Sequence, residues 1–369
     1  MKILLLTCHL FKSKNKAGFH HLAHALNTNG HHVHFCTCPN SILNLIQEIK
    51  TDSTRFYERL KTFFHSFFYA SNEGIISGGY FSIIHNYANL TVAQSLVKFF
   101  FLKGFSTLFS PSRGYDIIIF ESNVSLYLFE TLKKRFPSAK FVYRISDVLS
   151  LIGASQDLIA HETNLLDKFD LLIVPNLSMH EMFTRLTKNK ILIQHHGVNT
   201  KQYDQALTSP SPFTHFKRHA VYIGMSKFDW DFIRISSQLF PEIQFHIIGP
   251  YPQKISAPNI KYHGLLTFEN TLTYLAHCNF GLNIGIYPNE TDENFIKANK
   301  PLKYIQYTYF KKPMVSPSRL SLNEPHVFSY ELNNKSIQNA ICSAMNHTFV
   351  SNEIIKDWTD LSKEIISNL

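Results

Sequence analysis

Short apolar runs alternate with longer amphipathic stretches along the first 200 residues. The runs read KILLLTC, HHVHFCT, YDIIIFES, AKFVYRIS, FDLLIVPN and KILIQHHGVN. Between them, stretches such as GFHHLAHALNTNG and VSLYLFETLKKRF repeat apolar residues at helical spacing. Aliphatic strands that alternate with helices are typical of a parallel sheet covered on both faces. The pattern therefore predicts a βα domain over residues 1–200.

The alternation lapses once and then restarts. Residues 201–218 read KQYDQALTSPSPFTHFKR, and the prolines, serines and polar residues there predict a linker. From 219 to 347 the runs AVYIGM, IQFHIIGPY, IKYHG, FGLNIGIYP and PMVSPS predict a second βα domain. Residues 348–369 include an amphipathic stretch, predicted as a helix that packs across the interface. The predicted fold class is α/β, with two Rossmann-like βα domains facing each other across a cleft.

Composition and length narrow the class of protein. A chain of 369 residues with 44% hydrophobic residues is expected to hold about two domains with their own cores. No run of about 18 or more uncharged apolar residues is present, and no small-residue cleavage site follows MKILLLTCHLF. We therefore expect a cytoplasmic protein. The five cysteines are scattered and odd in number, which favours reduced thiols, and their spacing matches no zinc pattern, so no metal is predicted.

A formal net charge of +9 indicates a partner with negative charge. Basic residues alternate with aromatic blocks in RFYERLKTFFHSFFYA and LVKFFFLKGFSTLF, within residues 55–113. This mixture suits a surface that contacts an anionic membrane, although a pair of amphipathic helices packed on a core explains it equally well. No signature of nucleic-acid binding is present, so nucleic acid is not an expected partner.

Asp147 follows the predicted strand KFVYRI at its carboxyl end, where ligands bind in open α/β sheets. A carboxylate at this place can act as a general base that accepts a proton from a substrate hydroxyl. Ser146 and Asp147 are also favoured N-cap residues, so either could cap a helix that begins near Val148. Arg144 could lower the pKa of the aspartate, or it could be a solvent-facing residue at the strand end.

The stretch NKPLKYIQYTYF, residues 299–310, predicts a helix that begins at Pro301. Lys303 and Gln306 are three residues apart and share one face of this helix. A lysine in the first turn, together with the free amides there, makes a suitable site for a diphosphate. A solvated amphipathic helix is the alternative. The residues predicted to face the core are Leu302, Ile305 and Tyr309.

Two further stretches carry candidate ligand contacts. In YIGMSKFDWDF, Gly224 ends a strand and permits close approach of a ligand, and Ser226 offers a hydroxyl donor. Asp229 suits the N-cap of the helix that follows. This stretch is not a dinucleotide or Walker fingerprint. In QHHGVN, His196 could line the cleft, or it could belong to a structural histidine pair.

Several segments at compatible spacing resemble the bacterial glucuronosyltransferases of xanthan assembly. They read IIIFESNVSLYLFETLKKRFPSAKFVYRISDVLS, HHGVN, HAVYIGMSKFDWDF, FHIIG and KPLKYIQY, and the resemblance covers about residues 115–318. It implies the two-domain GT-B fold, in which residues 1–200 would face the acceptor and the membrane and residues 219–347 would bind the nucleotide-sugar donor. It also implies metal-independent, inverting transfer of a sugar, such as glucuronic acid, from a UDP-sugar to a polyprenyl-diphosphate-linked oligosaccharide in exopolysaccharide biosynthesis. The UDP-sugar is a substrate, so no cofactor is expected, and the enzyme would lie on the inner face of the bacterial cell membrane.

The resemblance also implies roles for individual residues. Asp147 matches the catalytic base, and Lys303 and Gln306 match the lysine and glutamine that bind the donor. Tyr287 falls near a donor-contacting tyrosine, and Asp229 matches an acidic position. The predicted donor-binding residues are Gly224, Met225, Ser226, Asp229, Tyr287, Lys303 and Gln306. The predicted residues on the acceptor side are His9, Arg144 and His196.

Two positions depart from the family pattern. Asn199 stands where the family has an aspartate, and Leu265 stands where it has an acidic residue on the donor side. The second change leaves the donor sugar open. The E-x7-E pattern of retaining GT-B enzymes is absent, which favours inversion. Two alternatives to the transferase remain at this point: a sugar-nucleotide epimerase of similar fold, and a noncatalytic protein that binds glycans or lipids.

Overall fold

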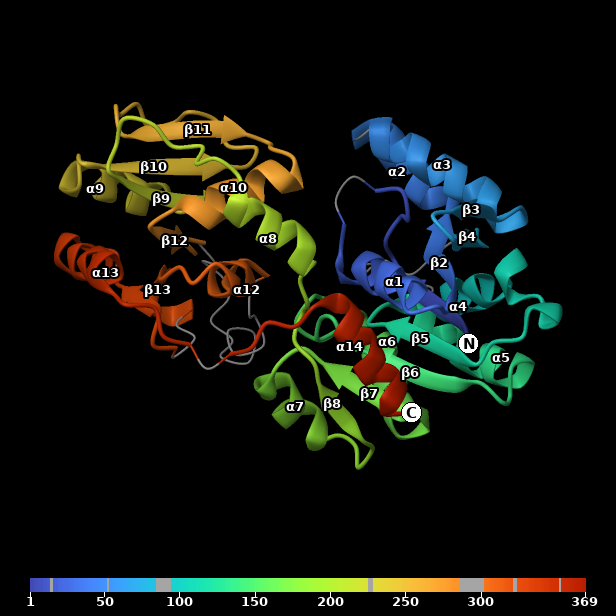
Figure 1. The fold of residues 1–369 in the computed structure, drawn as a ribbon. Helices are drawn as coiled ribbons and strands as arrows, with labels where there is room; N and C mark the ends of the chain where they lie inside the picture. Colours follow the sequence, from blue (N-terminus) through green and yellow to red (C-terminus); the bar gives the residue numbers. More distant parts are fainter. Residues whose placement is uncertain are drawn as a thin grey trace. The chain divides into compact units, whose positions relative to one another are not determined.

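The computed structural model describes residues 1–13, 16–51, 53–83, 94–224, 228–285, 302–320, 324–351 and 353–369. The chain divides into two compact units, each built around its own sheet (Figure 1). Unit 1 comprises Met1–Gly197 and Trp358–Leu369, and unit 2 comprises Val198–Asp357. Among the described helices, none combines the length with the apolar character that crossing a membrane requires.

Unit 1 contains an eight-stranded sheet in the order β3-β4-β2-β1-β5-β6-β7-β8. All neighbouring strands are parallel except β3 and β4. The central strands are buried on both faces, which explains their continuous aliphatic runs. The strands are β1 (Lys2–Thr7), β2 (His32–Ser41), β3 (Ala70–Asn72), β4 (Ile75–Ser82), β5 (Ile117–Glu121), β6 (Lys140–Arg144), β7 (Leu171–Val174) and β8 (Ile191–Ile193).

Helices cover this sheet, and the last helix of the chain is among them. The helices of unit 1 are α1 (Gly18–Thr28), α2 (Ile42–Thr51), α3 (Ser53–Phe67), α4 (Gln94–Leu102), α5 (Phe129–Arg135), α6 (Gln156–Leu165), α7 (Leu177–Thr184) and α14 (Trp358–Ser367). Helix α14 lies beside α1 (Figure 1), and Asn29 donates hydrogen bonds to the Thr359 carbonyl at 2.8 Å and to Ser362 Oγ at 2.6 Å. The carboxyl-terminal helix therefore belongs to the core of unit 1.

The hairpin of β3 and β4 was not predicted. The sequence pattern of residues 55–113 indicates helices or a membrane surface, but two strands extend the sheet within this region. The turn between them places Glu73 at φ 52° and Gly74 at φ 78°. Two consecutive positive φ angles are typical of a type I′ hairpin turn, so the dipeptide Glu73-Gly74 was an available signal.

Unit 2 contains a six-stranded sheet in the order β11-β10-β9-β12-β13-β14, and all neighbours are parallel. Its strands are β9 (Arg218–Ile223), β10 (Ile243–Ile248), β11 (Ile260–Gly264), β12 (Phe280–Leu282), β13 (Met314–Pro317) and β14 (Val327–Tyr330). Its helices are α8 (Thr200–Thr208), α9 (Trp230–Leu239), α10 (Phe268–His277), α12 (Leu302–Tyr309) and α13 (Asn334–Asn346). The predicted α/β class with two parallel βα units is confirmed.

The segment interpreted as a linker, residues 201–218, contains most of helix α8 and lies within unit 2. Asn199 begins this helix, because its side chain accepts a hydrogen bond from the amide of Gln202 at 3.3 Å. Tyr203 and Ala206 are buried in a core cluster of unit 2. Asparagine caps a helix as well as aspartate does, so the departure from the family at this position preserves the cap.

Candidate active site

The carboxyl ends of three neighbouring strands assemble the candidate site of unit 1. Strand β5 pairs with β1 on one side and with β6 on the other. Thr7, Cys8 and His9 lie at the end of β1, while Glu121 and Ser122 lie at the end of β5. The end of β6 contributes Arg144, Ser146 and Asp147. Because parallel strands end at the same edge, residues distant in sequence come together here.

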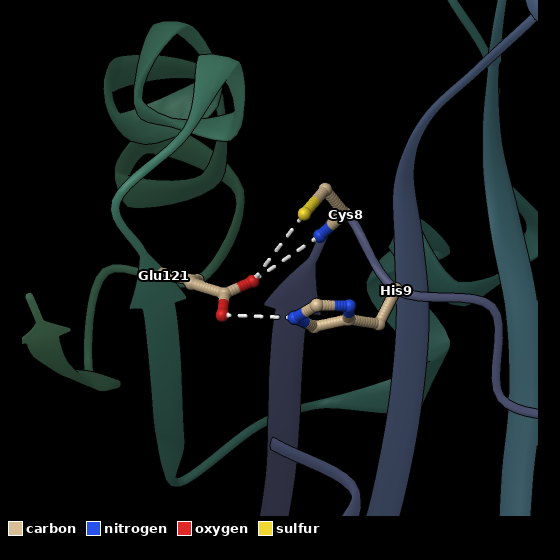
Figure 2. Close-up of side chains that lie close together, drawn as sticks. All are labelled: Cys8, His9 and Glu121. Carbon is tan, nitrogen blue, oxygen red and sulfur yellow. Dashed lines mark hydrogen bonds and ion pairs between the residues drawn. The ribbon is translucent and has the colours of Figure 1, made fainter. Parts of the chain in front are cut away.

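Glu121 is the centre of this edge and is only 5% exposed. Its Oε2 accepts hydrogen bonds from Thr7 Oγ1 at 2.5 Å and from the Cys8 amide at 3.3 Å. Its Oε1 lies 3.4 Å from His9 Nε2 (Figure 2). The same oxygen accepts from Ser146 Oγ at 3.3 Å. Burial alone would raise the pKa of Glu121, but the bond and charge of His9, with the donors on Thr7 and Cys8, lower it overall. Glu121 is therefore a buried carboxylate that stays ionised.

Asp147 lies beside this cluster and is exposed. Its backbone amide donates to Ser122 Oγ at 3.0 Å, and the amide of Ser146 donates to the same oxygen at 3.2 Å. Partial desolvation of its carboxyl group, followed by the charge of Glu121, raises the pKa of Asp147, while His9 opposes this. Within the described part of the chain, no hydrogen bond to its carboxylate oxygens is found. The turn holds Asp147 by its backbone and leaves its carboxylate available.

The capping interpretation of Ser146 and Asp147 is wrong, because no helix begins near Val148. The residues after Asp147 form turns that end at Gly153, with φ +76°, and helix α6 begins only at Gln156. The cap of α6 is Ser155, whose Oγ accepts from the Leu158 amide at 3.3 Å. Asp147 therefore does not cap a helix.

Arg144, predicted on the acceptor side, lies behind this edge. It is 3% exposed, so the alternative of a solvent-facing strand-end residue is wrong. Its Nη1 donates to Gln194 Oε1 at 2.8 Å, and the guanidinium lies 5.5 Å from the ring centroid of Trp358. Burial lowers its pKa to about 10, against a smaller opposing effect of Glu121, so Arg144 remains charged at neutral pH. These contacts tie β6 to helix α14.

His196, also predicted on the acceptor side, lies at the end of the segment that follows β8. It is half-buried, and its Nδ1 lies 3.5 Å from the place that a Cβ on Gly18 would occupy. Desolvation, aided by the charge of Arg144, lowers its pKa to about 4. His196 is therefore neutral at physiological pH, and it lines the junction of α1 and α14.

Cys8, His9 and Glu121 are the group among the described residues that could hold a metal ion, since their ligand atoms lie within 4.8 Å of one another (Figure 2). The Glu121 oxygens already accept protein hydrogen bonds. Desolvation and the charge of Glu121 raise the pKa of the Cys8 thiol to about 12, so the thiol keeps its proton. This chemistry fits a hydrogen-bonded cluster better than a metal centre.

The carboxyl ends of the strands in unit 2 form a second candidate edge. Lys303, in the first turn of α12, places its Nζ 4.5 Å from the ring centroid of Tyr222, at the end of β9. Desolvation lowers the pKa of Lys303 to about 8. The described residues provide its ammonium group with this ring contact and with no carboxylate partner. A partly desolvated cation that lacks an anion is a suitable site for a phosphate group.

Gly224 lies next to Tyr222, and a Cβ at this position would come within 2.3 Å of the Tyr222 hydroxyl. A side chain at position 224 would collide with the Tyr222 ring, which lies beneath Lys303, so this packing requires glycine. Tyr222 was not singled out from the sequence, because nothing in the run AVYIGM distinguishes it from a core residue. Its place beneath the lysine appears only in the folded unit.

Gln306 lies on the same helix as Lys303 and is 7% exposed. Burial raises the pKa of Tyr203 of α8 to about 12, and the side chain of Gln306 opposes this shift. Of the three residues predicted to face the core from this helix, Ile305 is buried at 2% exposure, whereas Leu302 is 50% exposed. The prediction for Leu302 is wrong, because the helix begins at this residue and its first turn lies at the open edge of the unit.

Asp229 is the N-cap of α9, and its Oδ1 accepts from the Phe232 amide at 2.9 Å. Its Oδ2 accepts from the Tyr330 hydroxyl at 3.1 Å, and the residue is 5% exposed. The capping interpretation is confirmed, and a buried carboxylate with both oxygens occupied favours a structural role over a donor contact. The other predicted donor residues, Met225, Ser226 and Tyr287, lie outside the described residues.

Comparisons with known proteins bear on this arrangement. Residues 5–175 match the family model described as "Glucuronosyltransferase GumK, N-terminal domain". A curated relative, the UDP-glucuronate:glycolipid 2-beta-glucuronosyltransferase of Xanthomonas campestris pv. campestris, is 28% identical over 257 residues. These residues are 69% of this chain and 62% of that relative, so the match spans less than two thirds of the relative's length. The resemblance drawn from the sequence is confirmed.

Solved structures show the same architecture. A UDP-glucosyltransferase from Polygonum tinctorium superposes with a TM-score of 0.52 at 8% identity, over 99% of this chain and 97% of that one. A glycosyltransferase of Arabidopsis thaliana, UGT89C1 with UDP, has a TM-score of 0.48 at 11% identity, over 99% and 95% of the two chains. The first likeness concerns the fold alone, and the GT-B fold class is confirmed.

Proposed function

We propose that this protein is an inverting glycosyltransferase. It transfers a sugar from a UDP-sugar, with glucuronic acid as the first candidate, to a polyprenyl-diphosphate-linked oligosaccharide in exopolysaccharide biosynthesis. The observation that carries the proposal is Asp147, an exposed carboxylate held by its backbone at the carboxyl edge of a GT-B sheet, with no hydrogen bond to its oxygens among the described residues. The match of residues 5–175 to a glucuronosyltransferase domain supports it.

In the proposed reaction Asp147 accepts the proton of an acceptor hydroxyl. The oxygen then attacks the anomeric carbon in line, the bond from this carbon to the diphosphate oxygen breaks, and UDP leaves on the opposite side. The raised pKa of Asp147 suits this task, because a base is most effective when its pKa approaches the working pH. Glu121 does not compete for the proton, since its own pKa is lowered.

Lys303 supports the donor half of the proposal. Its ammonium group lies over the Tyr222 ring and has no carboxylate partner in the described part of unit 2. A diphosphate could therefore supply the negative charge that pairs with it. The free amides of a helix's first turn add partial positive charge at the same place. Together they can stabilise the negative charge that develops on the leaving diphosphate, which is the task that a metal ion has in other enzymes. We therefore propose metal-independent transfer.

The lipid-linked acceptor requires contact with a membrane, and unit 1 carries exposed aromatic side chains on α3, on α4 and in the segments that follow these helices. Phe68 is 73% exposed, Phe64 is 56% exposed and Phe99 is 53% exposed. Lys61 and Lys103 belong to the same segments. Aromatic side chains mixed with cations are typical of surfaces that bind an anionic membrane. We place the enzyme on the inner face of the bacterial cell membrane.

A transfer assay tests the assignment of Asp147. The protein is incubated with labelled UDP-glucuronate, or another UDP-sugar, and a lipid extract that contains the acceptor. Asp147→Asn is expected to lower turnover by about 100-fold or more, since it removes a general base. UDP affinity measured by calorimetry is expected to stay unchanged. Asp360→Asn, which removes an exposed carboxylate of α14, is the matched control. Turnover within a few-fold of the parent would refute the role of Asp147.

Lys303→Met tests the donor site separately. Loss of a charge-assisted contact is expected to weaken UDP binding by roughly 10-fold to 100-fold, and unchanged binding would contradict the phosphate role. The same assays distinguish the alternatives. An epimerase would convert the UDP-sugar without any acceptor, and a noncatalytic protein would bind the acceptor without consuming the nucleotide sugar.

A further inference from the structure

A cavity of about 780 Å³ lies in unit 1, away from Asp147 and its neighbours. Its walls come from the start of β1, the segment after α3, strand β4, the end of α4 with the segment that leads to β5, and helix α5 with the residue before it. None of the residues that build the Asp147 edge lines it. Lys2 is the first residue of β1, and Arg113 precedes β5, whereas Asp147 follows the carboxyl end of β6. The cavity is therefore a separate feature, and its volume is typical of a ligand site.

The cavity is positively charged. Lys2, Arg113 and Arg135 line it, and no aspartate or glutamate is among the described residues of its wall. Lys2 Nζ donates to the Arg113 carbonyl at 2.5 Å, and Arg135 Nη1 donates to the Phe109 carbonyl at 2.6 Å. The guanidinium of Arg113 lies 4.2 Å from the ring centroid of Tyr69. All three contacts are to neutral groups, so the three positive charges are not neutralised within the cavity.

Hydroxyl groups line the cavity together with these cations. Ser110 and Ser112 lie on the wall with their Oγ atoms 2.8 Å apart, and Thr131 of α5 lines the same cavity. Thr107, also on the wall, has a buried hydroxyl for which the described structure provides no hydrogen-bond partner. Hydroxyl and guanidinium groups together are the donors that proteins use to bind phosphate oxygens. The cavity is therefore suited to a phosphate-bearing anion.

Several apolar side chains that line the cavity or adjoin it are exposed, and we call this set the aromatic rim. Among the lining residues, Tyr69 is 50% exposed, Phe105 is 47% exposed and Leu102 is 39% exposed. Phe68 and Phe99, next to these segments, are 73% and 53% exposed. A soluble phosphate ester does not need such a rim, whereas a phospholipid presents a charged headgroup next to acyl chains. Cations next to exposed aromatic side chains on one cavity favour the lipid.

We propose that this cavity binds the headgroup of an anionic phospholipid, with Arg113 and Arg135 contacting the phosphate and the aromatic rim entering the acyl boundary. This inference deepens the membrane contact of the proposed function and rests on that part of it. It does not depend on the identity of the donor sugar or on the role of Asp147. It assigns a specific lipid site where the sequence predicted only a general surface.

The experiment measures sedimentation of the full chain with vesicles. One set contains phosphatidylglycerol in phosphatidylcholine, and the other contains phosphatidylcholine alone. The double variant Arg113→Gln/Arg135→Gln is expected to bind the anionic vesicles at least about 10-fold more weakly than the parent, since each charge near the surface contributes about 1 kcal/mol. The matched control is Lys168→Gln/Lys188→Gln, which removes two charges from unit 1 outside the cavity and is expected to bind within about 3-fold of the parent.

A second variant covers the case in which the double variant fails to fold. Ser112→Glu places a negative charge in the cavity at an exposed position, and Lys188→Gln is its control with the same change in net charge. Ser112→Glu is expected to weaken binding to anionic vesicles by several-fold relative to this control. If Ser112→Glu and the double variant both bind like their controls, the cavity is not the lipid site, although general membrane contact stands.

Two further outcomes would overturn the proposal in different ways. If the parent does not bind anionic vesicles, the membrane contact of the proposed function fails together with the lipid site, while the transfer assay still decides the enzymatic activity. If glycerol 3-phosphate in solution raises the melting temperature in an Arg113-dependent manner and vesicles do not compete, the ligand is a soluble phosphate ester and the lipid assignment is wrong.

Discussion

The backbone amide of Asp147 donates a hydrogen bond to the hydroxyl oxygen of Ser122 at 3.0 Å. Ser122 is 7% exposed and follows β5 directly, so this bond fixes the turn after β6 against the neighbouring strand. The amide of Ser146 shares the same oxygen. The hydroxyl therefore positions the proposed base through its backbone and does not engage its carboxylate.

Replacing Ser122 by alanine should misplace Asp147 without removing it. Two amides lose their acceptor, so we expect turnover to fall by roughly 10-fold while the KM for the UDP-sugar changes little. Steady-state kinetics measures both quantities. Ser122→Thr keeps the hydroxyl and should recover most of the activity. Equal turnover of Ser122→Ala and the parent would mean that the turn does not depend on this bond.

Glu121→Gln should shift the pH dependence of the reaction. The charge of Glu121 raises the pKa of Asp147, so removing this charge lowers that pKa, and His9 lowers it in both proteins. A base with a lower pKa stays deprotonated to lower pH. The acidic limb of kcat/KM is therefore expected to move to lower pH.

A purely structural role of Glu121 would give a different result. The value of kcat/KM would then fall at every pH, and the acidic limb of its pH profile would not move. Thr7→Val removes a donor to Glu121 and the acceptor of the His9 amide but leaves the charge of Glu121 in place, so it is the control for such structural loss. The pKa of Asp147 can also be measured without catalysis. It follows from the difference between the parent and Asp147→Asn in how the free energy of unfolding depends on pH.

Three histidines cross the sheet of unit 2 in one hydrogen-bonded row. His219 Nε2 lies 2.9 Å from the Phe216 carbonyl, which can only accept, so this nitrogen carries the proton. Its Nδ1 must then accept from His246 Nε2 at 3.0 Å, and His246 Nδ1 accepts from His263 Nε2 at 2.9 Å. His219 and His246 are consequently neutral with fixed tautomers, and a second proton on either ring would break a bond of the row.

The row predicts that unit 2 loses stability in acid. Desolvation lowers the pKa of His246 to about 3 and that of His263 to about 4, with Lys261 adding to both shifts. The unfolded chain, with histidine pKa values of about 6.5, binds protons at higher pH than the folded chain does. Stability is therefore complete above about pH 6.5 and falls as the pH decreases from there toward 4.

The prediction is tested by urea unfolding of unit 2 between pH 7 and pH 5, followed by Trp230 fluorescence in a Trp358→Phe background. His263→Gln removes one titrating ring and should reduce the slope of unfolding free energy against pH by up to about 1.4 kcal/mol per unit. His215→Asn, at an exposed position with φ 71°, is the control and should leave the slope unchanged. A slope equal in all three proteins would contradict a buried neutral row.

Trp358 is the residue that fastens α14 to unit 1. It is 5% exposed, stacks with His21 at a centroid distance of 5.9 Å, and lies 3.4 Å from the place that a Cβ on Gly18 would occupy. Trp358→Ala should lower the free energy of unfolding of unit 1 by about 3–5 kcal/mol, because it leaves a cavity in the core. Circular dichroism in urea measures the loss. Lys363→Ala, on the exposed side of α14, should change it by about 0.5 kcal/mol or less, and a similar loss in both would contradict the packing role.

Much of the fold could be predicted from the sequence, because strands that are buried on both faces must be aliphatic and the helices between them amphipathic. The hairpin of β3 and β4 was missed, since short strands within an aromatic and basic region resemble the helices around them. At the candidate site, Asp147 was found from its place after a strand. Glu121 and Ser122 were not found, because their role depends on β5 lying next to β6, and the sequence pattern does not show which strands are neighbours.

The sequence by itself determined the α/β class, the presence of two βα units and the placement of Asp147 and Lys303 at the open ends of their elements. Hydrophobic period and residue type carry this information locally. Only the tertiary structure decided that no helix begins directly after Asp147. It also decided that both carboxylate oxygens of Asp229 accept protein hydrogen bonds, from the Phe232 amide and from Tyr330, and that three cations line one cavity. These facts depend on contacts between strands and helices far apart in the chain, and a pattern read along one segment contains no information about its neighbours in space.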